Sequence, residues 1–229
     1  MSVARTPRAI VFDMDGLLLN TEQLARNALR SAATELGVQF DEAVGAAMIG
    51  VPAEESQRLL LAHYGESISL DAFFAGSARH LRAQIDAGEM HLRPGAKALL
   101  EALQAAGVPR ALATSSGREK ALHHLNKAGV RGSFDVVVTR DDVARGKPHP
   151  DLFLLAAERL GTPPADCLAL EDSYNGVRAA HAAGMPVVMV PDLLPPTPEM
   201  REMAFAVVSC LDVVREMLAE DLTHAARSR

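Results

Sequence analysis

Two aspartates near the start of the chain, Asp13 and Asp15, have types and spacing that could support phosphoryl chemistry. They follow residues 9–12, a short continuous apolar run of the kind expected for a strand buried on both faces. Such a strand would deliver a carboxylate nucleophile and a second acidic group to the same end. Gly16 comes next and allows a backbone conformation that other residues resist. The pair alone is weak evidence, because acidic residues often follow strands.

Three further apolar runs end in polar residues that could complete one reaction centre. They are residues 110–113, followed by Thr114, Ser115 and Ser116; residues 134–138, followed after a loop by Lys147; and residues 167–170, followed by Glu171 and Asp172. Ligands of open α/β sheets bind outside the carboxyl ends of the strands, so these groups are expected to meet at one edge. Together they offer a nucleophile, donors for phosphate oxygens, a cation and carboxylates for a magnesium ion.

These segments resemble, in the same order along the chain, the four motifs of the haloacid dehalogenase superfamily. The matching segments are Phe12-Asp13-Met14-Asp15-Gly16, Ala113-Thr114-Ser115, Gly146-Lys147-Pro148 and Leu170-Glu171-Asp172-Ser173. The chain is most similar to the phosphatase branch that includes β-phosphoglucomutase. The resemblance implies an α/β fold, with a Rossmann-like parallel sheet core and an inserted all-helical cap domain.

The resemblance also implies a catalytic role for each matching residue. Asp13 is expected to attack phosphorus and form an aspartyl-phosphate, and Asp15 to act as general acid and then as general base. Lys147 is expected to balance negative charge during transfer. The phosphate-binding residues implied are Thr114, Ser115, Ser116 and Lys147.

The implied cofactor is Mg²⁺, which prefers oxygen ligands and usually keeps several waters. The expected ligands are the side chains of Asp13 and Asp172 and the backbone carbonyl of Asp15. Glu171 is expected to hold a metal-bound water instead. One departure from the family pattern is Asn20, which stands where an aspartate is usual, and we expect it to affect structure or specificity.

Hydrophobic periodicity divides the chain into a core and an insert. Residues 17–92 carry only helical patterns, with Asp41 and Ser69 placed as helix N-caps. Beyond them strands and helices alternate, which favours parallel strands joined by helical crossovers. We expect residues 1–16 and 93–229 to form the α/β core domain and residues 17–92 to form the helical cap domain.

The bulk composition limits the partners. The 229 residues are 48% hydrophobic and carry a formal net charge of −6, which argues against binding to nucleic acid or to an anionic membrane. The chain has no apolar run of roughly 18 residues and no signal-peptide pattern at its N-terminus. The two cysteines are too few for a zinc site. We expect a cytoplasmic monomer whose partner is a small phosphorylated metabolite.

The family also contains phosphosugar mutases, and one comparison of residues separates them from phosphatases. In the resembled mutases the cap supplies a histidine, a lysine and an arginine. The corresponding positions here are Ala25, Ile49 and Ala53, which cannot move a proton or hold a second phosphate by charge. Arg26 or Arg58 could substitute from a shifted register. The residues therefore favour a phosphatase, with a β-phosphoglucomutase-type mutase as the alternative.

Two further functions use related residues. A phospho-aspartate signalling module also places a threonine or serine and a lysine around an acidic site. The long helical insert and the second aspartate, Asp15, argue against that function, because acid–base chemistry would shorten the life of a phosphorylated switch. Dehalogenases of the family lack an aspartate at the position of Asp15, which argues against dehalogenation.

Overall fold

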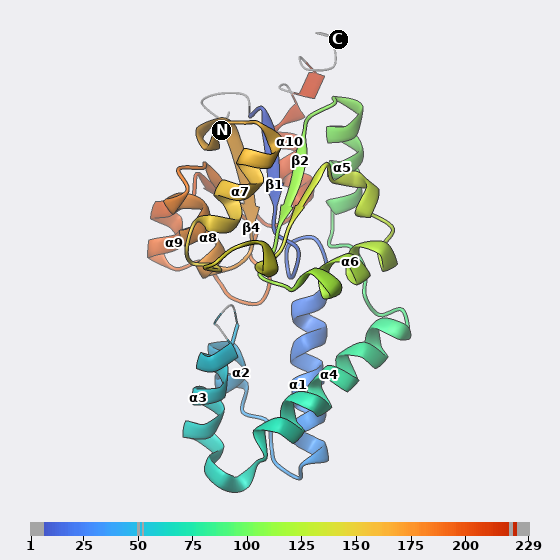
Figure 1. The fold of residues 1–229 in the computed structure, drawn as a ribbon, viewed down its shortest axis with the longest axis vertical. Coiled ribbons are helices and arrows are strands. Elements are labelled where there is room, and N and C mark those ends of the chain that lie inside the picture. Colours follow the sequence, from blue (N-terminus) through green and yellow to red (C-terminus); the bar gives the residue numbers. More distant parts are fainter. Residues whose placement is uncertain (1–6, 50, 52, 220–221, 224–229) are drawn as a thin grey trace. The chain divides into compact units, whose positions relative to one another are not determined.

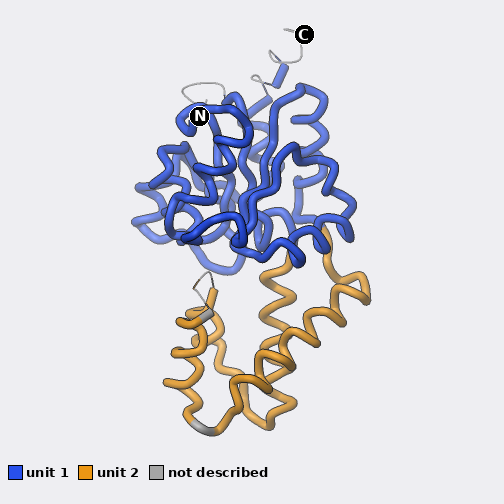
Figure 2. Tube along the Cα trace, in the orientation of Figure 1, with its two compact units in different colours: residues 1–19, 92–229 blue, residues 20–91 orange. Residues whose placement is uncertain are grey.

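The protein is described by a computed structural model that covers residues 7–49, 51, 53–219 and 222–223. The chain divides into two compact units, one formed by Met1–Leu19 with Leu92–Arg229 and the other by Asn20–His91 (Figure 2). The first boundary therefore falls after Leu19, beyond the position after residue 16 that we expected.

Six parallel strands form the sheet of the larger unit (Figure 1). They are β1 (Ala9–Phe12), β2 (Arg110–Ala113), β3 (Val136–Val138), β4 (Cys167–Glu171), β5 (Val187–Met189) and β6 (Ala206–Val207). Their order is β3-β2-β1-β4-β5-β6. Strand β1 is paired on both sides, and its four residues are all buried, which accounts for its unbroken apolar sequence. Phe12 pairs with Leu112 and with Leu170, so the central strands end at the same level.

Helices of the larger unit connect successive strands, as parallel pairing requires. They are α5 (Ala96–Ala105), α6 (Arg118–Lys127), α7 (Asp151–Leu160), α8 (Tyr174–Ala182) and α9 (Pro198–Met203), with the 3₁₀ turns η2 (Arg131–Ser133), η3 (Arg140–Asp142) and η4 (Pro164–Asp166). Helix α10 (Leu211–Met217) follows the last strand. The α/β fold with a parallel sheet and a helical insert, expected from the sequence, is confirmed.

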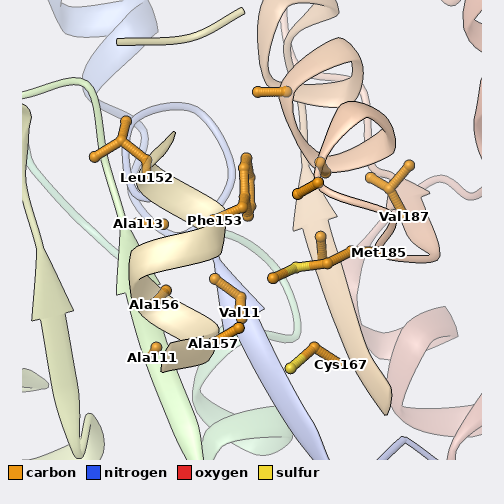
Figure 3. Close-up of a cluster of buried hydrophobic side chains, with 14 of the residues drawn as sticks. Val11, Ala111, Ala113, Leu152, Phe153, Ala156, Ala157, Cys167, Met185 and Val187 are labelled. Atoms are coloured by element: carbon orange, nitrogen blue, oxygen red, sulfur yellow. The ribbon is translucent and has the colours of Figure 1, made fainter. Parts of the chain in front are cut away.

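One face of α7 builds a large part of the core. Its residues Leu152, Phe153, Ala156 and Ala157 lie in one buried cluster with Val11 and the apolar side chains of neighbouring strands (Figure 3). The spacing of three and four residues places them on one side of the helix. Fully burying a side chain such as Phe153 stabilises the fold by roughly 1.5–3 kcal/mol.

The smaller unit is helical over its described residues. It contains α1 (Thr21–Glu35), α2 (Glu42–Ala47), α3 (Ala53–Tyr64), η1 (Gly65–Ser67) and α4 (Leu70–Asp86). Asp41 and Ser69 cap α2 and α4 as predicted, since their side chains accept hydrogen bonds from backbone N–H groups of the first turn. Its core is a separate cluster that includes Leu60, Ile68 and Phe73.

Some elements differ from the prediction. Helix α9 was not expected, and β3 begins at Val136 rather than at residue 134. Among the described residues, none of the helices combines the length and the apolar character that crossing a bilayer requires.

Candidate active site

The carboxyl ends of the central strands carry polar residues singled out in the sequence. Asp13 follows β1, and its N–H donates to the carbonyl of Leu170 at 3.0 Å. Thr114 follows β2, and its N–H donates to the carbonyl of Val138 at 3.0 Å. Each residue therefore continues the hydrogen bonding of the sheet, which fixes the point from which its side chain extends. Both residues are buried.

Lys147 joins three of these strand ends. Its Nζ donates to Oδ1 of Asp13 at 2.5 Å, to Oε1 of Glu171 at 2.5 Å and to the carbonyl of Ala113 at 2.9 Å. The side chain is only 5% exposed. The ring centroid of Phe153 lies 5.1 Å from Nζ, so the core helix α7 supports the ammonium group through its aromatic face.

Glu171 uses both carboxylate oxygens. While Oε1 accepts from Lys147, Oε2 accepts from the N–H groups of Asp172 and Ser173 and from the Ser173 hydroxyl, each at 3.0 Å. The residue is fully buried. Gly176, in the first turn of α8, leaves the space that the Glu171 carboxyl group fills, because a Cβ at Gly176 would lie 1.8 Å from its Cδ.

A group of three buried carboxylates could hold a metal ion. Oxygens of Asp13, Glu171 and Asp172 lie within 4.8 Å of one another. Carboxylate oxygens are the ligands that Mg²⁺ prefers, and three negative groups beside the single ammonium of Lys147 leave an excess of negative charge. This donor set fits a divalent cation. Glu171, which was expected only to hold a metal-bound water, is itself one of the three carboxylates of the group. Asp15, which was expected to ligate through its backbone carbonyl, follows Asp13 by two residues.

The charges of the cluster perturb one another. Burial raises the pKa of Asp13 well above its ordinary value of 3.8; Lys147 opposes this rise, while Glu171 and Asp15 add to it. Burial also disfavours the charged form of Lys147, but its attraction to Asp13 and Glu171 outweighs this effect and raises the pKa of the ammonium group. A divalent cation beside Asp13 would lower the pKa of its carboxyl group and favour the ionised nucleophile.

The second aspartate, Asp15, contacts the segment that follows β2. The hydroxyl of Ser116 donates to Oδ2 of Asp15 at 2.6 Å, and Oγ1 of Thr114 lies 3.5 Å from the same oxygen. Nζ of Lys120, on α6, lies 3.5 Å from Oδ1. Ser115 is exposed. The structure therefore brings Ser116, expected to bind phosphate, to the expected acid, and adds Lys120, which belongs to none of the motifs.

Known proteins share these features. A family model described as a haloacid dehalogenase-like hydrolase matches residues 7–184. The chain is 41% identical over 203 residues to the Drosophila melanogaster protein named "Probable pseudouridine-5'-phosphatase", a match that covers 83% of this chain and 84% of that one. It is 34% identical over 177 residues to the "Phosphorylated carbohydrates phosphatase" of Thermotoga maritima, covering 77% and 82%.

The fold matches that of a solved relative as well. CbbY from Rhodobacter sphaeroides, crystallised in complex with phosphate, has a TM-score of 0.75 and 29% sequence identity, with coverage of 90% of this chain and 95% of that one. The family model spans all four strand ends that carry the candidate site. This chain therefore belongs to the haloacid dehalogenase-like hydrolases and is a phosphatase of the β-phosphoglucomutase, CbbY and pseudouridine phosphatase subfamily.

Proposed function

We propose that this enzyme hydrolyses a small phosphorylated metabolite, such as a sugar phosphate, in a magnesium-dependent reaction through an aspartyl-phosphate on Asp13. The observation that carries the proposal is the 2.5 Å contact between Asp13 and Lys147 inside a group of buried carboxylates. In this proposal Asp13 is the nucleophile, Lys147 is the cation and the carboxylate oxygens are metal ligands, all at the carboxyl ends of the central strands. The names of the two relatives, which specify pseudouridine-5'-phosphate and phosphorylated carbohydrates, support a substrate that contains a sugar.

The reaction has two transfers at phosphorus. In the first, an oxygen of Asp13 bonds to phosphorus while the bond to the leaving alcohol breaks, and Asp15 donates a proton to the departing oxygen. In the second, Asp15 takes a proton from water as the water oxygen bonds to phosphorus and the bond to Asp13 breaks. The alcohol and inorganic phosphate are the products. Lys147 offsets negative charge on Asp13 and on the transferred group, and Thr114 contributes a hydroxyl donor.

A bound magnesium ion would supply neutralisation of the phosphoryl oxygens. The side chains of Asp13 and Asp172 and the carbonyl of Asp15 would hold it. Glu171 would contribute its negative charge beside the metal while it anchors Lys147 and the backbone of Asp172.

The residues of the helical insert favour hydrolysis over mutase chemistry. Two of the three positions at which the resembled mutases carry charged or proton-transferring residues are apolar here. Ala25 lies on α1, and Ile49 lies just before α3. Residues 50 and 52 lie outside the described part of the chain. Ala53 is the first residue of α3, although its side chain is also outside the description.

The two arginines that could have replaced a mutase residue have partners within the insert. Nε and Nη2 of Arg26 donate to Oε2 of Glu42 at 3.0 and 2.6 Å. Arg58 pairs with Glu55 on the same helix. Use of either arginine for a second phosphate would require it to leave its carboxylate partner, which supports a phosphatase.

The proposal is tested with a panel of phosphorylated metabolites that includes pentose, hexose, glycerol and nucleoside monophosphates. We expect release of inorganic phosphate that needs Mg²⁺ and stops with EDTA. With β-glucose 1-phosphate and a trace of glucose 1,6-bisphosphate, inorganic phosphate should form faster than glucose 6-phosphate. Faster formation of glucose 6-phosphate would identify a mutase. Phosphorylation of Asp13 without turnover of any ester would identify a signalling module.

A further inference from the structure

We propose that Lys120 and Ser116 are positioning residues that orient the carboxyl group of Asp15 for proton transfer. This inference rests on the proposed hydrolysis, in which Asp15 is the acid and base. Each of the two residues contacts a different oxygen of Asp15. Ser116 Oγ donates to Oδ2 at 2.6 Å, and Lys120 Nζ lies 3.5 Å from Oδ1. Contacts at both oxygens fix the plane of the carboxyl group as well as its position.

The local backbone places the two donors beside Asp15. The N–H of Ser116 donates to Oγ1 of Thr114 at 3.0 Å, so the loop folds back onto the end of β2. The N–H of Arg118 donates to Oδ2 of Asp141 at 2.8 Å, which holds the start of α6. With both points held, the first turn of α6 brings Lys120 toward Asp15.

Lys120 supplies the positive charge that faces Asp15 from α6. His124 lies one turn further along the same helix and is buried. Burial lowers the pKa of His124, an effect that its attraction to Asp15 only partly opposes. Asp15 is 14% exposed and Lys120 is 46% exposed. An ion pair this close to solvent contributes little to stability, so its value lies in orientation. Small errors in the placement of a catalytic group cost large factors in rate.

Two synthetic esters of similar size separate a role in positioning Asp15 from a role in folding or in phosphate binding. The alcohol leaving from benzyl phosphate must be protonated, whereas p-nitrophenolate leaves from p-nitrophenyl phosphate with little need for an acid. We expect Lys120→Met and Ser116→Ala each to lower kcat/KM for benzyl phosphate about tenfold and kcat/KM for p-nitrophenyl phosphate less than about threefold. The ratio kcat/KM reports the first transfer, in which only the benzyl alcohol needs a proton, whereas both esters share the later hydrolysis of the aspartyl-phosphate. Lys120→Arg and Ser116→Thr, which keep a donor, should restore most of the rate.

Two controls make the test specific. Lys127→Met removes the same charge from an exposed position on the same helix and should leave both rates unchanged. In an Asp15→Asn enzyme, adding Lys120→Met should cause no further loss, because its target carboxylate is gone. The proposal is overturned by an equal loss of kcat/KM on both esters, or by the same further loss in the Asp15→Asn enzyme. A wild-type enzyme that releases no phosphate from these esters or from any member of the metabolite panel would instead refute the proposed hydrolysis.

Discussion

Gly176 shows how closely the charged residues of the site depend on an uncharged neighbour. Its backbone does not have the left-handed conformation that favours glycine. A Cβ at this position would lie 1.8 Å from Cδ and Oε1 of Glu171, so the glycine is needed for space. Glu171 in turn holds Lys147 and the N–H of Asp172. Displacing Glu171 would therefore disturb both the cation and the carboxylate group.

We expect Gly176→Ala to lower phosphatase activity at least tenfold and to destabilise the fold by roughly 1–3 kcal/mol, the usual cost of overpacking. An alanine in a helix otherwise stabilises relative to glycine, so a loss would isolate the clash with Glu171. Thermal unfolding and phosphate release measure the two effects. Gly132→Ala is the control, because a Cβ there meets no atom within 4 Å. A Gly176→Ala enzyme as stable and active as the control would show that Glu171 moves freely.

At this scale the sequence predicts the residues that follow strands and misses those that depend on packing. The sequence alone predicts that Asp13, Thr114 and Asp172 lie close together, because the carboxyl ends of parallel strands meet at one edge of the sheet. The contact of Lys120 with Asp15 could not be predicted in this way, because the start of α6 is held by a tertiary hydrogen bond, from the N–H of Arg118 to Asp141. The space at Gly176 depends on how α8 packs over the end of β4.

At the scale of elements, the turn η3 links the strand β3 to the two helices beside it. Thr139 and Asp142 form a capping box, in which Oδ2 of Asp142 accepts from the N–H and the hydroxyl of Thr139, each at 2.8 Å. Oδ1 of Asp142 accepts from Arg118 at the start of α6 and from Arg159 in the last turn of α7. The turn therefore helps to hold the helix that carries Lys120.

Asp142 should make stability depend on pH in the acid range. Burial opposes its ionisation, but the hydrogen bonds from Thr139 and Arg159 and the charge of Arg118 outweigh burial and lower its pKa from 3.8 to about 2. Because the folded pKa lies below the unfolded one, this stabilisation is complete above about pH 4 and is lost as the pH falls toward 2.

We expect Asp142→Asn to lower the free energy of unfolding by roughly 1–2 kcal/mol at pH 7, with the difference from wild type shrinking between pH 4 and pH 2. Denaturant unfolding across that range measures it. The control Glu101→Gln removes a charge from an exposed pair with Lys97 and should have little effect. A difference that stays constant down to pH 2 would contradict the ionised capping box.

Most elements could be predicted from apolar runs, and two of the misses have physical causes. The N–H of Arg110 donates to Oδ2 of Asp135 at 2.8 Å, so a side chain takes the hydrogen bond at this point. The ladder between β3 and β2 therefore begins only at Val136. Helix α9 has a cap signal in Thr197 followed by Pro198, but only six residues, too few for a clear helical stripe. Short elements are fixed by tertiary contacts more than by local sequence.

At the scale of the whole molecule, the chain passes twice between the α/β unit and the helical unit. Asn20, where the family usually has aspartate, lies at the first of these crossings on the helical side and is buried. Its Nδ2 donates to the carbonyl of Glu89 at 3.1 Å, and its Oδ1 accepts from the N–H of His91 at 2.8 Å. The amide thus ties the beginning of the helical unit to its end, with a donor that aspartate lacks.

We expect Asn20→Asp to destabilise the helical unit by about 1 kcal/mol, because it loses the bond to Glu89 and places a negative charge beside a carbonyl oxygen. Hydrogen exchange should accelerate in peptides from residues 20–35 and 84–91, while the α/β unit stays protected. Gln57→Glu, which adds the same charge at an exposed position of α3, is the control. Unchanged exchange in both peptides would show that the amide donor is not needed.

Transfer of the phosphoryl group to Asp13 is tested most directly by trapping it. The enzyme is mixed with Mg²⁺ and a substrate identified in the metabolite panel, quenched in acid within the first turnover, digested and analysed by mass spectrometry. We predict a phosphoryl group on the peptide that contains Asp13, its absence with EDTA, and loss of both the adduct and at least about 10³-fold of the turnover in Asp13→Asn. Full turnover by Asp13→Asn, or an adduct on another residue, would contradict a nucleophilic Asp13.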